Sequence, residues 1–431
     1  KCAEKTVLTE KLIHYFRQIP DYRCGREKRH DLGEMLVCVT LGFLCGRTTI
    51  RRSLKWCKTH LEELRKHMNL KYGIASPSTI TRMLNGIDEE LALYAFMEWI
   101  GEIVESRNTH LAIDGKALCG ATEKTKGETT PMLLNVVETV RGLILAQLPV
   151  DSKTNEITAI PELLKLLDIS GSIVTIDAVG TQTAIMEQIH EQGGHFVLTV
   201  KKNQPEAYEE IHTFMDKLGA EDLKRKKGEA MDPGMKEFLE KYEEISQMEK
   251  NRDRNEYRTC QICKDASNLT KSQKEWPHVQ SIGRIKQVRI PKEKDSQGND
   301  VTPSKEEFLE KGSRRIPAPS AGEGAGKDVQ CTALISDLIL TAEELGSIKR
   351  MHWSIENRLH HVLDDTFRED RSPAKKSRNN LSLIRKYAYN ILRLAMYETG
   401  LANIMTEMMD CFCDNAALRE QYVFQGIASL Y

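Results

Sequence analysis

The sequence has no apolar run long enough to cross a membrane. Its longest strongly apolar stretch, residues 35–45, spans 11 residues, whereas a helix needs about 20 to cross the hydrocarbon core of a bilayer. No charged segment followed by an apolar one opens the chain at Lys1, so no signal sequence is expected. The 11 cysteines are odd in number and irregularly spaced, which favours reduced thiols over a disulfide framework. These absences predict a soluble, cytoplasmic protein with no membrane partner.

The chain also lacks an overall charge imbalance, but its charges are unevenly distributed. It has 62 Lys and Arg residues against 63 Asp and Glu, a net charge of −1. Residues 1–80, however, hold 16 basic and 8 acidic side chains, and residues 371–393 hold seven basic and no acidic ones. Two basic blocks in a neutral chain indicate binding to a polyanion such as DNA, although a basic run can also be a solvated face.

The length of 431 residues predicts roughly two or three domains, since one domain takes about 150 residues. Residues 1–100 show apolar side chains at helical spacing, which predicts an all-α N-terminal domain. Within it, Ser76 and Pro77 precede an apolar stripe through Ile80, Met83 and Leu84, which is the pattern of a capped helix start. This helix fits either the second helix of a helix-turn-helix or an ordinary surface helix.

From residue 111 the pattern changes to alternating strands and helices. Runs at 132–139 and 143–150 flank a short turn, which predicts a β-hairpin. A helix is expected at 158–167, a strand at 173–176, a helix at 181–192 and a strand at 196–200. This order predicts an α/β fold with a mixed sheet flanked by helices.

A charged segment interrupts this alternation. Of the 130 residues in the 201–330 window, 51 are charged and apolar runs are short, which predicts an insertion with little structure of its own. Helices are expected again at 342–363 and 379–396. The predicted parts are therefore residues 1–100 (helical, DNA-binding), 101–204 (core, first part), 205–330 (insertion), 331–400 (core, second part) and 401–431 (C-terminal tail).

Three acidic residues stand out by their context. Asp114 and Asp177 each follow a short apolar strand and precede small residues, which leaves space for a ligand beyond the strand end. Glu356 lies at the edge of the apolar stripe of the 342–363 helix, with His360 four residues later. Carboxylates from two strands and a helix could hold two Mg²⁺ ions about 3.5–4 Å apart. The spacing alone also fits ordinary solvated acids.

The apolar stripe of that helix is expected to run through Ile355, Leu359 and Val362. A second candidate metal site is Cys260-x-x-Cys263, but no second pair follows it, and a structural zinc ion takes four ligands.

Longer motifs make the sequence similar to a known family. They are Asp114-Gly115-Lys116, residues 155–161, residues 174–178, residues 193–198, Lys201 to Gln204, residues 352–360, Leu363-Asp364 and residues 367–370, together with Asp21-Tyr22-Arg23 and Lys28-Arg29-His30 near the N-terminus. These blocks resemble the DDE transposases of bacterial insertion sequences, in the H-repeat-associated (ISAs-type) branch with its associated N-terminal domain. The resemblance covers roughly residues 15–400, apart from much of 205–325.

The resemblance implies a ribonuclease-H-like core in which Asp114, Asp177 and Glu356 are both the catalytic and the metal-binding triad. The implied cofactor is Mg²⁺, two ions per site, with Mn²⁺ as a substitute. The wider superfamily places Arg and Lys where this chain has His352 and Leu363.

Six further residues are expected to contact DNA, three beside the core strands and three in the C-terminal basic run. They are Lys116, Lys201, Asn203, Arg378, Arg385 and Lys386. For the two lysines beside the strands, solvated side chains at the sheet ends are the alternative.

The function implied is a metal-dependent transposase that acts in the nucleoid. Its partners would be double-stranded DNA, both terminal inverted repeats and target, and a second copy of the chain in a homodimer on paired ends. Two alternatives stay open from the sequence: a metal-dependent DNA nuclease without strand transfer, and an inactive, DNA-binding transposase relic.

Overall fold

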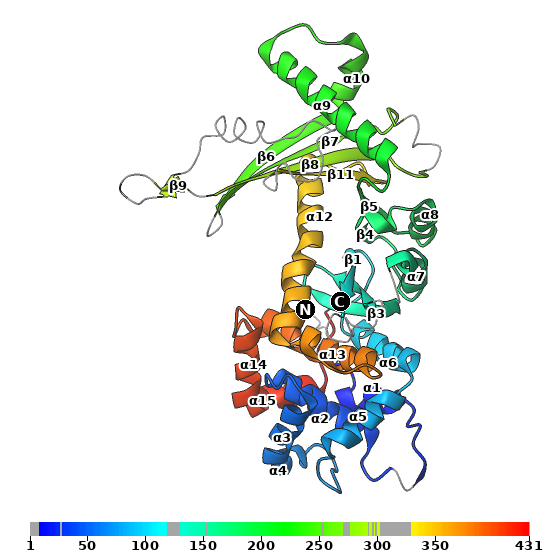
Figure 1. The fold of residues 1–431 in the computed structure, drawn as a ribbon, viewed down its shortest axis with the longest axis vertical. Helices are drawn as coiled ribbons and strands as arrows, with labels where there is room; N and C mark the ends of the chain where they lie inside the picture. The colour runs from blue at the N-terminus through cyan, green and yellow to red at the C-terminus, as the bar shows by residue number, and fades with distance from the viewer. Residues whose placement is uncertain are drawn as a thin grey trace, which may run out of the picture. The chain divides into compact units, whose positions relative to one another are not determined.

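Figure 1 shows the fold of the chain in a computed structural model, which divides into two units. The structure describes residues 8–25, 28–118, 130–150, 153–250, 254–269, 276–291, 293–294, 297, 300–301 and 329–430. Unit 1 comprises residues 1–172 and 353–431, and unit 2 comprises residues 173–352. Among the described helices, none combines the length and apolar content that a membrane crossing requires.

Unit 1 begins with the helical region that the sequence predicts. Its helices are α1 (Leu12–Gln18), α2 (Leu32–Leu44), α3 (Ile50–Thr59), α4 (Leu61–Leu64), α5 (Pro77–Gly86) and α6 (Glu89–Gly101). The longest apolar run of the sequence falls in α2, and every residue of this helix is buried. The Asp31 side chain caps α2 by accepting a hydrogen bond from the Glu34 amide at 2.8 Å. A helix buried on all its faces is stable here because neighbouring helices pack around it.

The C-terminal helices belong to the same unit. They are α13 (Arg378–Thr399), α14 (Met405–Asp414) and α15 (Ala416–Arg419). Tyr387 on α13 packs against Phe16, Phe96 and Trp99, with ring centroids 4.7–4.8 Å apart. This aromatic cluster joins the two ends of the chain, because α13 lies among the N-terminal helices.

Three antiparallel strands complete unit 1. They are β1 (His110–Ala117), β2 (Met132–Glu138) and β3 (Leu143–Val150), in the order β3-β2-β1. The predicted hairpin is β2–β3, and Gly142 supplies the positive φ of 75° at its turn. Helix α7 (Lys153–Lys165), α6 and α13 pack against β3.

Unit 2 contains a mixed sheet in the order β4-β5-β11-β8-β7-β6. The strands are β4 (Ile173–Ile176), β5 (His195–Val200), β6 (Tyr242–Lys250), β7 (Arg254–Cys263), β8 (Ser281–Pro291) and β11 (Val329–Ser336). β4 and β5 are parallel, and the other pairs are antiparallel. Helices α8 (Thr183–Glu191), α9 (Pro205–Lys227) and α10 (Lys236–Glu240) pack on these strands.

The charged segment has more structure than its composition predicts. Instead of a sparse insertion, residues 205–291 contribute α9, α10 and three long strands that extend the sheet beyond β11. Charged side chains tolerate this because they pair with one another, as Arg284 does with Asp216 at 2.7 Å. Cys260 and Cys263 both lie on β7, and residues three apart on a strand face opposite sides. They therefore do not form a common metal site.

The predicted fold class is confirmed: the chain is α/β, with mixed strands flanked by helices and a helical N-terminal region. Helix α12 (Ala342–Ile355) then runs from unit 2 into unit 1 along the chain. Its first half packs closely on the sheet of unit 2. A Cβ at Gly283 of β8 would lie 2.4 Å from the Leu345 side chain of this helix and 3.0 Å from the Gln261 carbonyl oxygen, so the glycine favours this close approach.

Candidate metal centre

Asp114 lies inside a strand rather than at its end. The sequence predicts that the strand stops at residue 113, but β1 continues to Ala117 because its backbone pairs with β2 as far as Met132. In this register Asp114 is opposite Asn135. Its side chain keeps 30% exposure and its Oδ1 accepts a hydrogen bond from the Gly115 amide at 3.0 Å. The strand therefore holds the carboxylate at a fixed position on the face of the sheet.

Glu356 begins a π-helical segment that continues α12. Residues Glu356–His360 form a wider turn, and the amide of His361 donates to the carbonyl oxygen of Glu356, five residues earlier. The Tyr389 hydroxyl donates to the Arg358 carbonyl oxygen at 2.9 Å, so a carbonyl within the widened turn has a partner. π-Helical turns within α-helices occur frequently at functional sites.

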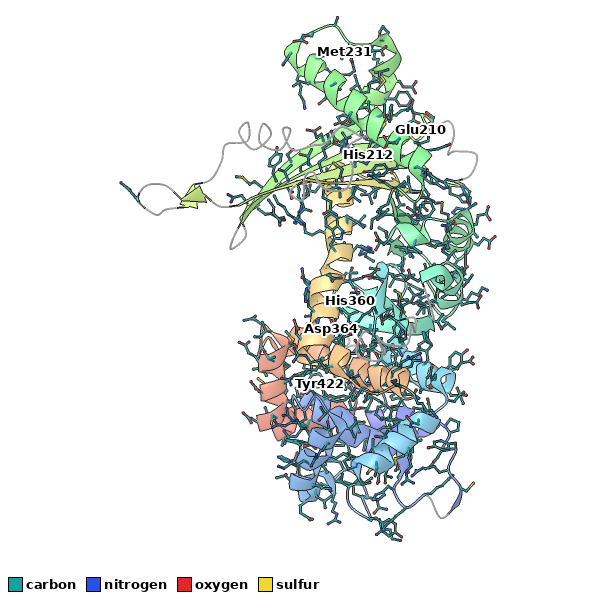
Figure 2. All side chains as sticks on the ribbon, in the orientation of Figure 1. Glu210, His212, Met231, His360, Asp364 and Tyr422 are labelled. Carbon is teal, nitrogen blue, oxygen red and sulfur yellow. The ribbon has the colours of Figure 1, made fainter. Side chains whose placement is uncertain are left out.

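The widened turn changes which residues are buried. The sequence predicts an apolar stripe that passes through Val362, but the buried residue is Leu363, with 0% exposure. An extra residue in the turn moves the stripe one position along the chain. A second π-helical stretch, Val362–Thr366, follows. His360 and Asp364 therefore lie one turn apart on the same helical segment (Figure 2).

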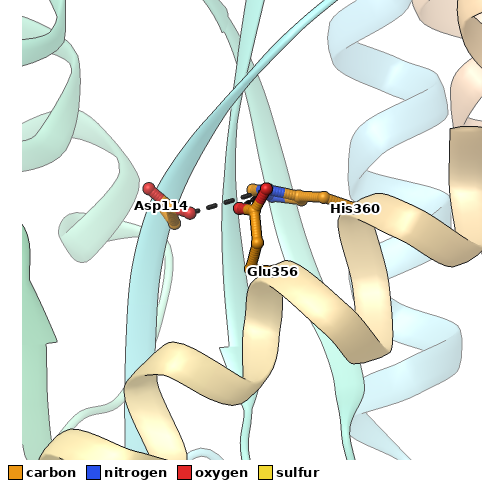
Figure 3. Close-up of side chains that lie close together, drawn as sticks. All are labelled: Asp114, Glu356 and His360. Carbon is orange, nitrogen blue, oxygen red and sulfur yellow. Dashed lines mark hydrogen bonds and ion pairs between the residues drawn. The ribbon is translucent and has the colours of Figure 1, made fainter. Parts of the chain in front are cut away.

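Asp114, Glu356 and His360 converge on one point (Figure 3). The His360 Nδ1 atom is 3.2 Å from Glu356 Oε2 and 3.7 Å from Asp114 Oδ2. One ligand atom from each of the three residues lies within 4.8 Å of the others. Sequence reasoning placed His360 beside Glu356 but did not count it among the site residues. Its spacing from Glu356 was the available signal.

His360 does not neutralise the two carboxylates at neutral pH. Burial lowers the pKa of its imidazole below the usual value, and the neighbouring Glu356 only partly offsets this effect. Its Nε2 atom is buried with no hydrogen-bond partner among the described residues. Two carboxylates and a neutral imidazole at this spacing therefore match the donor set of a divalent cation. Carboxylates suit Mg²⁺ and Mn²⁺, and imidazole suits the softer transition metals.

Asp177 lies in unit 2, directly after β4. Its Oδ2 atom is 2.5 Å from Lys201 Nζ. Burial acts to raise the pKa of Asp177, but Lys201 outweighs it and the pKa is lowered, so this carboxylate is ionised at neutral pH. The convergence of Asp177 with the pair in unit 1 stays a prediction.

The segment after β5 shapes the loop that follows Asp177. Asn203 Nδ2 donates to the Ala178 carbonyl oxygen at 3.0 Å, and Gln204 Nε2 donates to the Thr181 carbonyl oxygen at 2.5 Å. Lys201 and Asn203 are both exposed, so they can also meet a ligand. Their predicted DNA contacts are untested.

His352, where the wider superfamily has Arg, is buried in unit 2. Its Nδ1 atom is 3.0 Å from the Thr175 hydroxyl of β4. On the same helix, Lys349 Nζ donates to the Thr199 hydroxyl of β5 at 2.8 Å. These two bonds attach α12 to the strands on either side of Asp177 in the chain.

Lys116 is buried rather than solvated. Its Nζ atom lies 2.5 Å from Asp364 Oδ1 and 3.4 Å from carboxylate oxygens of Glu369 and Asp370. Burial acts to lower its pKa, but the three acids outweigh that effect and raise it. Lys116 thus joins β1 to the segment that follows Glu356. With only 4% of its side chain exposed, it has no free access to a DNA phosphate.

Arg385 and Lys386 are also buried, at 3% and 0% exposure, which differs from the solvent-facing positions expected for DNA contacts. Arg385 is 3.8 Å from Glu369. Lys386 Nζ donates to Asn135 Oδ1 at 2.5 Å and to Gln147 Oε1. The helical periodicity of α13 could not reveal the burial of these two side chains, because neighbouring elements cover the polar face of the helix as well as the apolar one. Arg378, at the start of α13, remains partly exposed.

Two family models together cover most of the sequence. Residues 105–391 match the family described as "Transposase DDE domain", and residues 13–100 match the family "DDE_Tnp_1-associated". The three residues that converge in unit 1 all lie within the first of these matches.

Similar proteins are known in bacteria. "Putative protein YbfL" and "H repeat-associated putative transposase YhhI", both of Escherichia coli K12, are each 28% identical over 89% of this chain and 90% of their own length. "H repeat-associated putative transposase YbfD" of the same strain is 32% identical over 45% of this chain and 78% of its own.

Among solved structures, the piggyBac transposase synaptic complex with hairpin DNA aligns over 96% of this chain and 79% of its own, with a TM-score of 0.40 and 10% identity. That likeness is too low to support an argument about this chain. The match to the DDE domain, in contrast, covers more than half of the sequence, and the chain therefore belongs to the DDE transposase family.

Proposed function

We propose that this protein is a DNA transposase that cuts the ends of its insertion sequence and joins them to target DNA. The observation that carries the proposal is the convergence of Asp114 and Glu356, which come from distant parts of the sequence. One carboxylate oxygen of each and one ring nitrogen of His360 lie within 4.8 Å of one another. Membership of the family and the transposase names of its relatives support the same reaction.

Asp114, Asp177 and Glu356 would hold the divalent ions, Mg²⁺ or Mn²⁺. When bound, two such ions activate a nucleophile and stabilise the leaving oxygen of a phosphodiester. The chain's own residues prepare the site. His360 Nδ1 lies within hydrogen-bond distance of the Glu356 carboxylate, at 3.2 Å, and Lys201 keeps Asp177 ionised.

Two successive displacements at phosphorus account for cutting and joining. In the first, water attacks the phosphodiester at the transposon end and the 3′-oxygen leaves as a hydroxyl group. In the second, that 3′-hydroxyl attacks a target phosphodiester and displaces its 3′-oxygen. No covalent bond between protein and DNA is needed. Pairing of two ends for this reaction implies a homodimer in the nucleoid.

The test uses DNA from either side of the gene, where the proposed function expects terminal inverted repeats. Asp114→Asn, Asp177→Asn and Glu356→Gln should each abolish cleavage but keep DNA binding, because an amide has the same shape and lacks the charge that holds a cation. The stabilisation of the wild-type chain by Mn²⁺, read as a rise in Tm, should also be lost. Asp365→Asn is the matched control, since Asp365 is exposed on the same helical segment.

Each alternative gives a different result. Normal cleavage by any one triad variant would remove that residue from the site. Cleavage without joined products in a paired-end assay would show a nuclease, and binding by the wild-type chain without any cleavage would show an inactive relic.

A further inference from the structure

The N-terminal helical region contains a cleft that the proposed reaction does not use. It has a volume of about 290 Å³ and is lined by residues from the segments 17–34 and 69–73, all within unit 1. The cations around it include Lys28, Arg29 and Lys71, and all three are exposed. Lys28 and Arg29 belong to one of the sequence motifs that the metal centre leaves without a role.

An exposed aromatic ring lies among these cations. Tyr72 is 50% exposed. The Arg29 guanidinium is 5.1 Å and the Lys71 Nζ atom 5.2 Å from the centre of its ring. His30 contacts the same ring edge-on, at 6.4 Å. A half-exposed tyrosine surrounded by cations is a surface that suits an anion with an attached apolar or aromatic group.

The loop that carries Lys71 and Tyr72 is held by hydrogen bonds to the buried side chain of Glu34. Glu34 is buried, and its two carboxylate oxygens accept the amides of Asn69 and Leu70 at 2.9 and 3.1 Å. Leu70 takes a positive φ of 41°, a strained conformation for a branched side chain. The two hydrogen bonds to the buried carboxylate therefore hold this strained loop, whose exposed residues include Lys71 and Tyr72.

Three acids, Asp21, Asp31 and Glu34, also line the cleft, and each lies close to an arginine. Asp21 pairs with Arg23 at 2.7 Å, and Arg17 lies 3.6 Å from Asp31 and 3.8 Å from Glu34. Across the described residues, Arg29 and Lys71 contact the Tyr72 ring but form no ion pair. These two charges are therefore available to a ligand.

We propose that this cleft binds the DNA backbone, with Arg29 and Lys71 on phosphate oxygens and the Tyr72 ring against the adjoining nucleotide. The inference rests on the proposed function for its partner, since it takes the DNA that the transposase acts on. Phosphate contacts hold DNA in register and carry no sequence information. The cleft would therefore position DNA on the N-terminal region without selecting the transposon end.

The experiment measures how the affinity for a short fluorescent duplex depends on KCl concentration, with the full-length chain. Each phosphate contact adds about −0.9 to the log–log slope, so the double variant R29Q/K71Q should flatten the slope by about two units. The effect should be equal on inverted-repeat and random DNA. Because both side chains are exposed, the variant should fold normally.

The matched control is K55Q/K58Q, which removes two exposed lysines of α3 that do not line the cleft. An equal flattening in this control would show a general charge effect and overturn the proposal, as would an unchanged slope in R29Q/K71Q. Y72F should bind as the wild type and Y72L more weakly. Equal binding by both would remove the ring from the contact.

Failure of this inference is distinguishable from failure of the proposed function. Cleavage and joining by the wild-type chain, together with an unchanged slope in R29Q/K71Q, would overturn the cleft alone. DNA binding that depends on the cleft, without cleavage, would support the cleft and overturn the transposase. A wild-type chain that binds no DNA would overturn both.

Discussion

Lys386 offers a direct test of how the buried charges of unit 1 behave. Its side chain is fully buried on α13, and its Nζ atom donates to the amide oxygens of Asn135 and Gln147. Burial lowers the pKa of Lys386 to about 7, although the nearby Glu369 acts in the opposite direction. The perturbation is Lys386→Met, which keeps the length of the side chain and removes its charge.

The sign of the effect follows from proton binding. A lysine in the unfolded chain has a pKa of about 10.4, so between pH 7 and 10.4 the unfolded chain binds a proton that the folded chain does not. Stability must therefore rise with pH across this window, and below pH 7 the full cost of burying the charge is present. With one pKa unit worth about 1.4 kcal/mol, the gain between pH 7 and pH 9 is about 2 kcal/mol.

The Lys386→Met chain lacks this titration. Its free energy of unfolding relative to the wild type should therefore fall by about 2 kcal/mol from pH 7 to pH 9. The two amide oxygens left without a donor add a loss of about 1–3 kcal/mol each, which does not depend on pH. The pH dependence of the difference isolates the lysine from these losses.

The assay is guanidinium denaturation of both chains at several pH values from 6 to 9, followed by Tm measurements on the same samples. Lys376→Met is the control, since Lys376 is exposed near the same helix, and it should follow the wild type at every pH. If the free energy of unfolding changed with pH in the same way for the wild type and for Lys386→Met, the reasoning would be refuted. The buried lysine would then have an ordinary pKa. Lys386→Met should also leave the salt dependence of DNA binding unchanged.

Two further predictions concern exposed cations. Lys201→Gln removes the partner that lowers the pKa of Asp177. That pKa should rise, and the acid limb of the pH profile of cleavage should therefore move to higher pH. An unchanged acid limb would count against a role for the Lys201–Asp177 pair in cleavage. Arg378→Gln should flatten the salt slope of DNA binding by about one unit if Arg378 contacts a phosphate, and an unchanged slope would leave it as a solvated side chain.

Local signals in the sequence were enough to predict most elements. The hairpin of β2 and β3 follows from two apolar runs around a glycine turn, and the start of α5 follows from Ser76 and Pro77. Ser76 does cap this helix, with its hydroxyl accepting from the Thr79 amide at 3.2 Å. Such features depend on residues close in the chain, and their energies are therefore visible in the pattern itself.

The candidate site was only partly visible in this way. Asp114, Asp177 and Glu356 were identified by their context and by resemblance to a family, and Asp114 and Glu356 do converge. The position of His360 beside the two carboxylates was not predicted. A histidine at helical spacing gives the same sequence pattern whether it packs in a core or lies beside two carboxylates. The π-helical turn that buries Leu363 instead of Val362 was missed for the same reason.

The sequence by itself predicted the α/β class, the helical N-terminal region, the family and the three acidic residues that are proposed to hold the metal ions. Only the tertiary structure decided which charges meet solvent. Arg385 and Lys386 belong to the C-terminal basic run and Lys116 follows a predicted strand, yet all three lie buried among acids and amides. Hydrophobic periodicity indicates which face of a single helix or strand is apolar. The burial of these charges depends instead on residues of β2, β3 and the segment after Glu356, which are distant in the sequence. A lysine becomes a structural cation only where those distant groups replace the water that it loses.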